Sequence, residues 1–218
     1  MDISVLIPNL TQATIETVYM VGLSTVFTII LGLPLGVLLV ITDKNGLTSL
    51  PIANQVIGTI VNMARSLPFI ILLVLVIPFT RMVVGTTIGA TAAIVPLSLA
   101  AIPFFARIAE TSLREVDKGL IEAAQAMGCT TWQIIVKVLI PESISSLILG
   151  VALTIISLIG YSAMAGAIGG GGLGDLAIRY GYQRTETEVM IATVVLLIAV
   201  VQGIQLFGDK LAQKMSKR

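Results

Sequence analysis

The chain has 218 residues, of which 56% are hydrophobic and only 11% are charged, and its mean hydropathy is +1.01. Soluble domains carry roughly 25% charged residues, so the composition excludes a soluble globular protein and predicts an integral membrane protein. The formal net charge of +1 argues against general binding to nucleic acid, and no nucleic-acid partner is expected.

Five apolar stretches are long enough to cross a hydrocarbon core, which takes roughly 20 residues of helix. In chain order they lie at about 18–41, 57–79, 88–106, 144–164 and 189–207. Residues 1–17 precede them as an outer or interfacial segment with a short helix over Ile3–Glu16, and Leu47–Gln55 is predicted to lie at the interface before the second span. Four prolines predict bent helices, namely Pro34, Pro68, Pro96 and Pro103. The sequence thus predicts an all-α bundle of five transmembrane helices.

Basic residues are distributed unequally between the loops of this arrangement. If the N-terminus lies outside, nine basic residues fall in inner segments and three in outer segments. The inner ones are Lys44, Arg107, Arg114, Lys118, Lys137, Lys210, Lys214, Lys217 and Arg218, and the outer ones are Arg81, Arg179 and Arg184. The positive-inside rule therefore predicts an outer N-terminus, a cytoplasmic loop over 107–142 and a basic cytoplasmic tail over 208–218.

The chain carries no recognisable energy source of its own. It contains no GxxxxGK[ST] phosphate-binding loop, so we expect no nucleotide cofactor and no enzymatic activity. Histidine is absent and Cys129 is the only cysteine, which argues against a disulfide and against a zinc or haem site. The span interiors also lack the carboxylates that proton-driven carriers use as relays. Any uphill transport is therefore expected to be driven by a separate subunit.

Within this heavily charged loop, residues 122–141 read EAAQAMGCTTWQIIVKVLIP. Glu122 is followed by the small side chains of Ala123, Ala124 and Ala126, which let another backbone approach closely. This pattern predicts a docking surface on a cytoplasmic helix. The alternative is that the alanines are ordinary helix residues.

The residues after these alanines predict a helix, a turn and a second helix. Gly128 is expected to end the first helix in a left-handed conformation. Thr130 and Gln133 have the spacing of a capping box for a second helix over 132–140. Pro141 is expected to stop that helix where the chain re-enters the membrane.

The order Glu-Ala-Ala, three residues, Gly and then Val138-Leu139-Ile140-Pro141 resembles the cytoplasmic signature of ABC importer permeases. This resemblance implies the type I ABC importer permease fold. In that family the loop holds the coupling helix, which sits in a cleft on the ATPase subunit. It therefore implies a coupling role for Glu122, Ala123, Ala124, Ala126 and Gly128, with Pro141 fixing the exit of the loop.

Further stretches resemble the methionine-uptake permeases, namely 65–73, 77–81, 160–164 and 169–174. The resemblance implies a multi-pass permease of the bacterial cytoplasmic membrane, surrounded by membrane lipid. This permease imports methionine, in its D- and L-forms, by alternating access. Its implied partners are a second copy of itself, two ABC ATPase subunits that bind ATP and Mg²⁺, and an extracytoplasmic methionine-binding lipoprotein. A permease for another small amino acid or peptide, a secondary carrier or channel, and a membrane scaffold stay open as alternatives.

Five residues are candidates for the translocation pathway or its gate, namely Arg65, Pro68, Tyr161, Ser162 and Met164. Arg65 is the only charge well inside an apolar run, where insertion costs at least about 2.5–3.5 kcal/mol. It is expected either to reach the inner interface or to be buried and hydrogen-bonded at a bundle or dimer interface. Met164 offers a soft thioether lining, or is an ordinary apolar residue of the membrane span.

The loop GGGGLGDLAIRYGY over 169–182 lacks the strand and the lysine of a nucleotide-binding loop. Its glycines instead predict a tight or packed turn on the outer side. The resemblance places this loop near the translocation path, as a packing element or a gate.

Overall fold

The computed structural model describes residues 3–216, and within this range it contains helices and no strand. Residues 1–2 and 217–218 of the predicted terminal segments lie outside the described residues. The long helices are α1 (Ile3–Ile41), α5 (Ala90–Arg114), α9 (Ile144–Gly166) and α11 (Thr187–Ser216). The shorter ones are α2 (Pro51–Ser66), α3 (Phe69–Leu75), α4 (Ile77–Val84), α6 (Lys118–Ala126), α7 (Thr131–Ile134), η1 (Ile135–Leu139), α8 (Ile140–Glu142), α10 (Gly172–Leu176) and η2 (Ala177–Tyr182).

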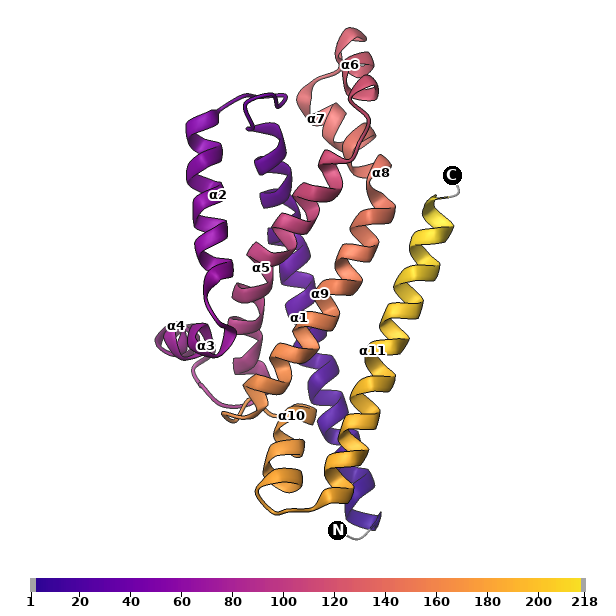
Figure 1. The fold of residues 1–218 in the computed structure, drawn as a ribbon. Coiled ribbons are helices and arrows are strands. Elements are labelled where there is room, and N and C mark those ends of the chain that lie inside the picture. Colours follow the sequence, from indigo (N-terminus) through magenta and orange to yellow (C-terminus); the bar gives the residue numbers. More distant parts are fainter. Residues whose placement is uncertain (1–2, 217–218) are drawn as a thin grey trace.

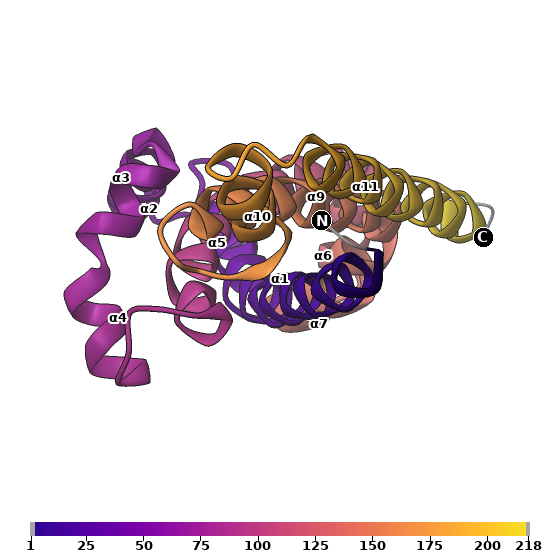
Figure 2. The same ribbon diagram turned by 90° about the horizontal axis from the view of Figure 1, so that it is seen from below.

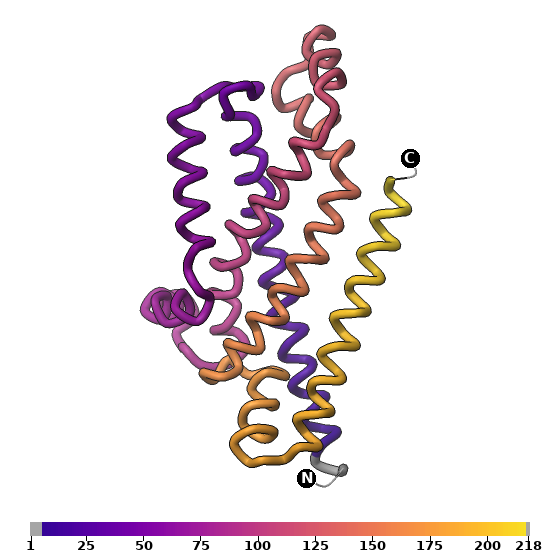
Figure 3. The backbone as a smooth tube through the Cα atoms, viewed as in Figure 1, coloured from indigo at the N-terminus to yellow at the C-terminus, as the bar shows by residue number. Residues whose placement is uncertain are grey.

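The long helices lie lengthwise in one bundle, as the ribbon and the tube both show (Figures 1 and 3). Four of the described helices are long and apolar enough to cross a membrane, or five if the bent pair α2–α3 counts as one span. The helix α1 begins at one end of the bundle, whereas α11 finishes toward the other end, where α6 and α7 also lie (Figure 1). The predicted all-α class is therefore confirmed.

The second predicted span, 57–79, is not a single straight helix. The helices α2 and α3 meet at an angle of 102°, and α3 and α4 stand beside the bundle when it is seen from below (Figure 2). Pro68 cannot donate a backbone hydrogen bond and disfavours a helical residue before it, and Leu67 is accordingly extended, with ψ 125°. The helix α2 begins at Pro51, earlier than the predicted span. The predicted interfacial stretch Leu47–Gln55 is therefore divided between a loop and the first turns of α2.

Several helices continue beyond the predicted spans. The short helix expected over Ile3–Glu16 is the first part of α1, which is unbroken to Ile41. The helix α5 extends past residue 106 to Arg114, and α11 includes most of the predicted tail. Hydropathy marks only the apolar part of a helix. The end of α11 is mostly exposed, and its two buried residues, Gly208 and Ala212, lie against α9.

The contact between α1 and α5 depends on small residues at four-residue spacing. A Cβ atom on Gly36 would lie 2.7 Å from the carbonyl oxygen of Ala106, and one on Gly32 would lie 3.1 Å from that of Ile102. Ser24, on the same face of α1, donates to the Ile94 carbonyl at 3.4 Å. Because lipid gives no hydrophobic force between helices, such close approach stabilises their association.

Candidate functional site

The end of the bundle where α5 finishes carries an exposed helix–turn–helix, the α6–α7 element (residues 118–134). The carboxylate of Asp117 caps α6 by accepting the Gly119 N–H at 2.7 Å. Gly128 has φ +78°, and the Cys129 N–H donates back to the Ala124 carbonyl at 3.1 Å. The predicted left-handed glycine cap is confirmed, and it turns the chain sharply after α6.

The predicted capping box of the second helix is also confirmed. The Thr130 hydroxyl accepts the Gln133 N–H at 3.3 Å, and the Gln133 side chain accepts the Thr130 N–H at 2.8 Å. The helix does not stop at Pro141, however. It widens into the π-helix η1 and continues through α8 toward α9. Pro141 lacks an N–H and its ring crowds the preceding turn, so a widened turn is the alternative to a break.

The structure divides the alanines of α6 between two faces. Ala124 is only 3% exposed, because it packs into the cluster of Val37, Leu113, Val116, Ile134, Ile135 and Leu139. Ala123, Ala126 and Gly128 are exposed. The expectation of one outward-facing alanine patch is therefore wrong for Ala124, which supports the element from inside.

Two large apolar side chains on the same element were missed by sequence reasoning. Met127 is 76% exposed and Trp132 is 72% exposed. Their presence within a charged loop was the signal that could have identified them as part of an exposed binding surface. Together with the exposed alanines they give the α6–α7 element an apolar surface that no other part of residues 3–216 covers.

A chain of charged side chains lies next to this element. Glu110 on α5 is 7% exposed and accepts hydrogen bonds from Arg107 at 2.6 Å and from Arg114 at 2.8 and 3.1 Å. Arg114 also donates to Asp43, after α1, at 2.6 Å. This guanidinium holds the pKa of Asp43 below its usual range. The ends of α1 and α5 are thereby joined.

Polar contacts extend this connection to α2. The guanidinium of Arg107 donates to the Gly58 carbonyl at 3.1 Å and to the Asn62 side chain at 3.0 Å. The Asn54 side chain donates to the Leu39 carbonyl at 2.6 Å and to the Thr42 hydroxyl at 3.0 Å. The helices α1, α2 and α5 are therefore linked by side chains near the α6–α7 element.

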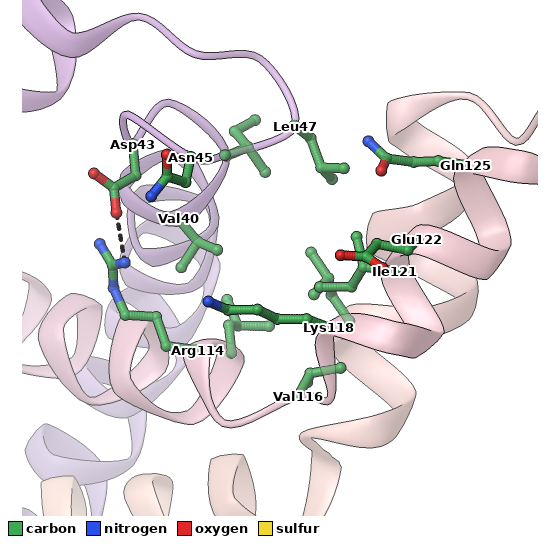
Figure 4. Close-up of a pocket in the computed structure, with 14 residues that line it drawn as sticks. Val40, Asp43, Asn45, Leu47, Arg114, Val116, Lys118, Ile121, Glu122 and Gln125 are labelled. Atoms are coloured by element: carbon green, nitrogen blue, oxygen red, sulfur yellow. Dashed lines mark hydrogen bonds and ion pairs between the residues drawn. The ribbon is translucent and has the colours of Figure 1, made fainter.

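A groove of about 570 Å³ separates α6 from the loop after α1. Figure 4 shows Lys118, Glu122 and Gln125 reaching from α6 toward that loop, and Asp43 paired with Arg114 on the far side. Glu122 therefore lines the groove, whereas Ala126 does not.

The five candidate pathway residues do not form one cluster. Arg65 is exposed in the last turn of α2, at the end of that helix remote from α6 (Figure 1). It is thus neither at the α6 end of the bundle nor buried within this chain. Pro68 forms the bend, and the next residue, Phe69, stacks on Tyr161 with ring centroids 4.7 Å apart.

The other two candidates differ in burial. Ser162 is buried and donates within α9 to the Ile159 carbonyl at 2.8 Å. Met164 is 49% exposed. Within residues 3–216 no group of His, Cys, Asp and Glu is placed to hold a metal ion.

The membrane-length helices, the exposed helix–turn–helix at one end of the bundle and the family match together define a multi-pass membrane permease with the type I ABC importer fold. Residues 45–217 match the family described as the binding-protein-dependent transport system inner membrane component, and the chain belongs to this family.

Similar proteins are found in several bacteria. The chain is 52% identical over 206 residues to a probable D-methionine transport system permease protein MetI of Pasteurella multocida, covering 94% of this chain and 95% of that protein. It is 46% identical over 210 residues to the methionine import system permease protein MetP of Bacillus subtilis, covering 96% and 95%. A chain of the inward-facing MetNI methionine ABC transporter superposes with a TM-score of 0.93 at 45% identity, covering 99% of both chains.

Proposed function

We propose that this chain is the permease subunit of an ATP-driven methionine importer in a bacterial cytoplasmic membrane. The observation that carries the proposal is the similarity over nearly the whole chain to permeases whose names state methionine transport. Those names include both D-methionine and methionine, which supports uptake of both stereoisomers.

The subunit works as a homodimer with two ABC ATPase subunits. The absence of a phosphate-binding loop from the sequence is consistent with nucleotide being bound by another chain. The apolar face of the α6–α7 element is the surface offered to the ATPase, because Met127, Trp132 and Ala126 are exposed there. A methionine-binding protein delivers the substrate to the opposite side.

This assignment places the α6–α7 element and the C-terminus in the cytoplasm and the N-terminus outside. The support is the excess of lysine and arginine in the segments at the α6 end. ATP binding draws the ATPases together and moves the two α6–α7 elements with them. Because side chains join α1, α2 and α5 beside this element, the inner ends of these helices follow, and the pathway opens outward.

The docking surface is tested by co-purifying the chain with its ATPase after Ala126→Arg. Ala126 is exposed, so the variant should insert and fold but lose the ATPase and methionine uptake. Ala167→Arg is the matched control, because Ala167 is also exposed but follows α9 near the other end of the bundle. It should keep the ATPase. A complex that forms normally with Ala126→Arg would show that the contact is misplaced.

The substrate is tested in proteoliposomes that contain the complete complex and the binding protein. ATP-dependent uptake of labelled L-methionine should be competed by D-methionine and not by an unrelated small amino acid. ATP-dependent uptake of a different amino acid in place of methionine would favour the alternative importer.

A further inference from the structure

The glycine-rich loop, residues 169–174 including the start of α10, has backbone conformations at three positions that side chains would not tolerate. Gly169, Gly171 and Gly172 have φ values of +90°, +75° and +77°. A Cβ atom on Gly172 would lie 2.5 Å from the Met20 methyl and 2.6 Å from the Thr17 hydroxyl, both on α1. The glycines therefore allow the loop to lie directly against α1.

Two side chains of α1 hold this loop through its backbone. The Glu16 carboxylate accepts the Gly172 N–H at 2.8 Å, and the Thr17 hydroxyl accepts the Leu173 N–H at 2.9 Å. The Gln12 side chain donates to the other oxygen of Glu16 at 2.9 Å and fixes its orientation. Glu16 is thus placed to make a charge-assisted hydrogen bond between segments that are 156 residues apart.

The same loop also contacts α5 and α9. The Gly89 N–H, just before α5, donates to the Gly169 carbonyl at 2.8 Å. A Cβ atom on Gly174 would lie only 2.4 Å from the Cα of Ala163 in α9. Seen from below, α10 and its loop lie across the ends of the bundle opposite α6 (Figure 2). The loop therefore joins α1, α5 and α9 at that end.

We propose that Glu16 is a positioning residue that, together with Thr17, latches the glycine-rich loop to α1 and keeps the outer end closed while the pathway faces the cytoplasm. The proposal rests on the proposed function, because a transporter must separate its outer helix ends to take up substrate. The chain superposes on an inward-facing transporter, the state in which such a latch is engaged. Releasing the latch also separates Leu173 and Leu176 from Ala13 of α1, with which they form a buried cluster.

The latch is tested by the accessibility of a cysteine placed at Leu176, which is 3% exposed and packs with Ala13 of α1. Cys129 is replaced by alanine, and a membrane-impermeant maleimide is added from outside to the complete complex in proteoliposomes. Without nucleotide, Glu16→Gln should raise the labelling rate by about tenfold, the population shift expected when a hydrogen bond to a charged group is weakened. Thr17→Val should raise it in the same direction.

Trapping the ATPases in the ATP-bound state should raise labelling of the wild type and add little in Glu16→Gln. A purely structural role would not give this dependence on nucleotide. Thr14→Val is the matched control, because the Thr14 hydroxyl donates only within α1, to the Leu10 carbonyl at 2.6 Å. It should label like the wild type.

The latch is refuted if Glu16→Gln and Thr17→Val label at the wild-type rate. It is also refuted if either isosteric variant fails to give a monodisperse complex, because the contact would then be needed for folding. Failure of the wild type to bind an ATPase or to take up methionine would instead refute the proposed function. In that case nucleotide-free labelling of the permease reconstituted without the ATPase still reports whether Glu16 holds the loop.

Discussion

Replacing Glu110 with glutamine removes a charge that two arginines share. The Glu110 side chain is 9% exposed, whereas those of Arg107 and Arg114 are 25% and 44% exposed. Breaking a fully buried ion pair costs about 3–5 kcal/mol, because the remaining charge stays buried. Here water reaches both guanidinium groups, so we expect the free energy of unfolding to fall by about 2–3 kcal/mol.

The measurement is unfolding of the purified chain in mixed micelles of nonionic detergent and SDS, followed by far-UV circular dichroism. Asp43→Asn is the matched control, because it removes a carboxylate from the same Arg114 at a pair that is 35% and 44% exposed. This variant should lose at most about 1 kcal/mol. Equal losses in the two variants, or a loss below about 1 kcal/mol for Glu110→Gln, would refute the view that Glu110 is the buried centre of the network.

Two further predictions also concern the stability of the fold, the first by the same unfolding measurement and the second by thermal melts. Gly36→Ala places a Cβ atom 2.7 Å from the backbone oxygen of Ala106, so α1 and α5 must separate and the protein should lose about 1–3 kcal/mol. Gly22→Ala meets no atom within 4 Å and should be neutral or slightly stabilising; equal destabilisation by both would contradict the close-packing argument. Because Arg114 lowers the pKa of Asp43, this ion pair stabilises the fold above the ordinary carboxyl pKa of 3.8 and loses that effect as the pH falls through the lower folded value. In thermal melts in nonionic detergent, the melting temperature of the wild type should therefore exceed that of Asp43→Asn by a constant amount from about pH 7 to about pH 5, and by less below about pH 4. A difference in melting temperature that persists unchanged to about pH 2 would contradict this prediction.

Features that depend on neighbouring residues could be predicted from the sequence. The all-helical class follows from the apolar stretches, and the caps at Gly128 and Thr130 follow from side chains within three or four residues of the groups that they satisfy. Pro68 also marked a bend. Its angle of 102° could not be predicted, because it depends on how α3 packs against other helices, as in the stacking of Phe69 on Tyr161.

Features that depend on distant segments were not predictable from one sequence. Arg114 and Asp43 are 71 residues apart, and nothing in either local pattern identifies the other as its partner. Glu16 looked like a residue at the edge of a span until the fold brought Gly172 beside it. Ala124 was assigned to the docking surface with its neighbours, because helical spacing gives the faces of a helix but not which face the rest of the protein covers.

The π-helix η1 places one widened turn between the α6–α7 element and α9. An α-helix advances about 100° per residue, so the extra residue of a π-bulge offsets the side chains on its two sides by about that angle. The faces of α7 and α9 are therefore out of phase, although the backbone between them is nearly continuous. In the proposed mechanism, a displacement of the α6–α7 element would therefore have to pass through this widened turn to reach α9.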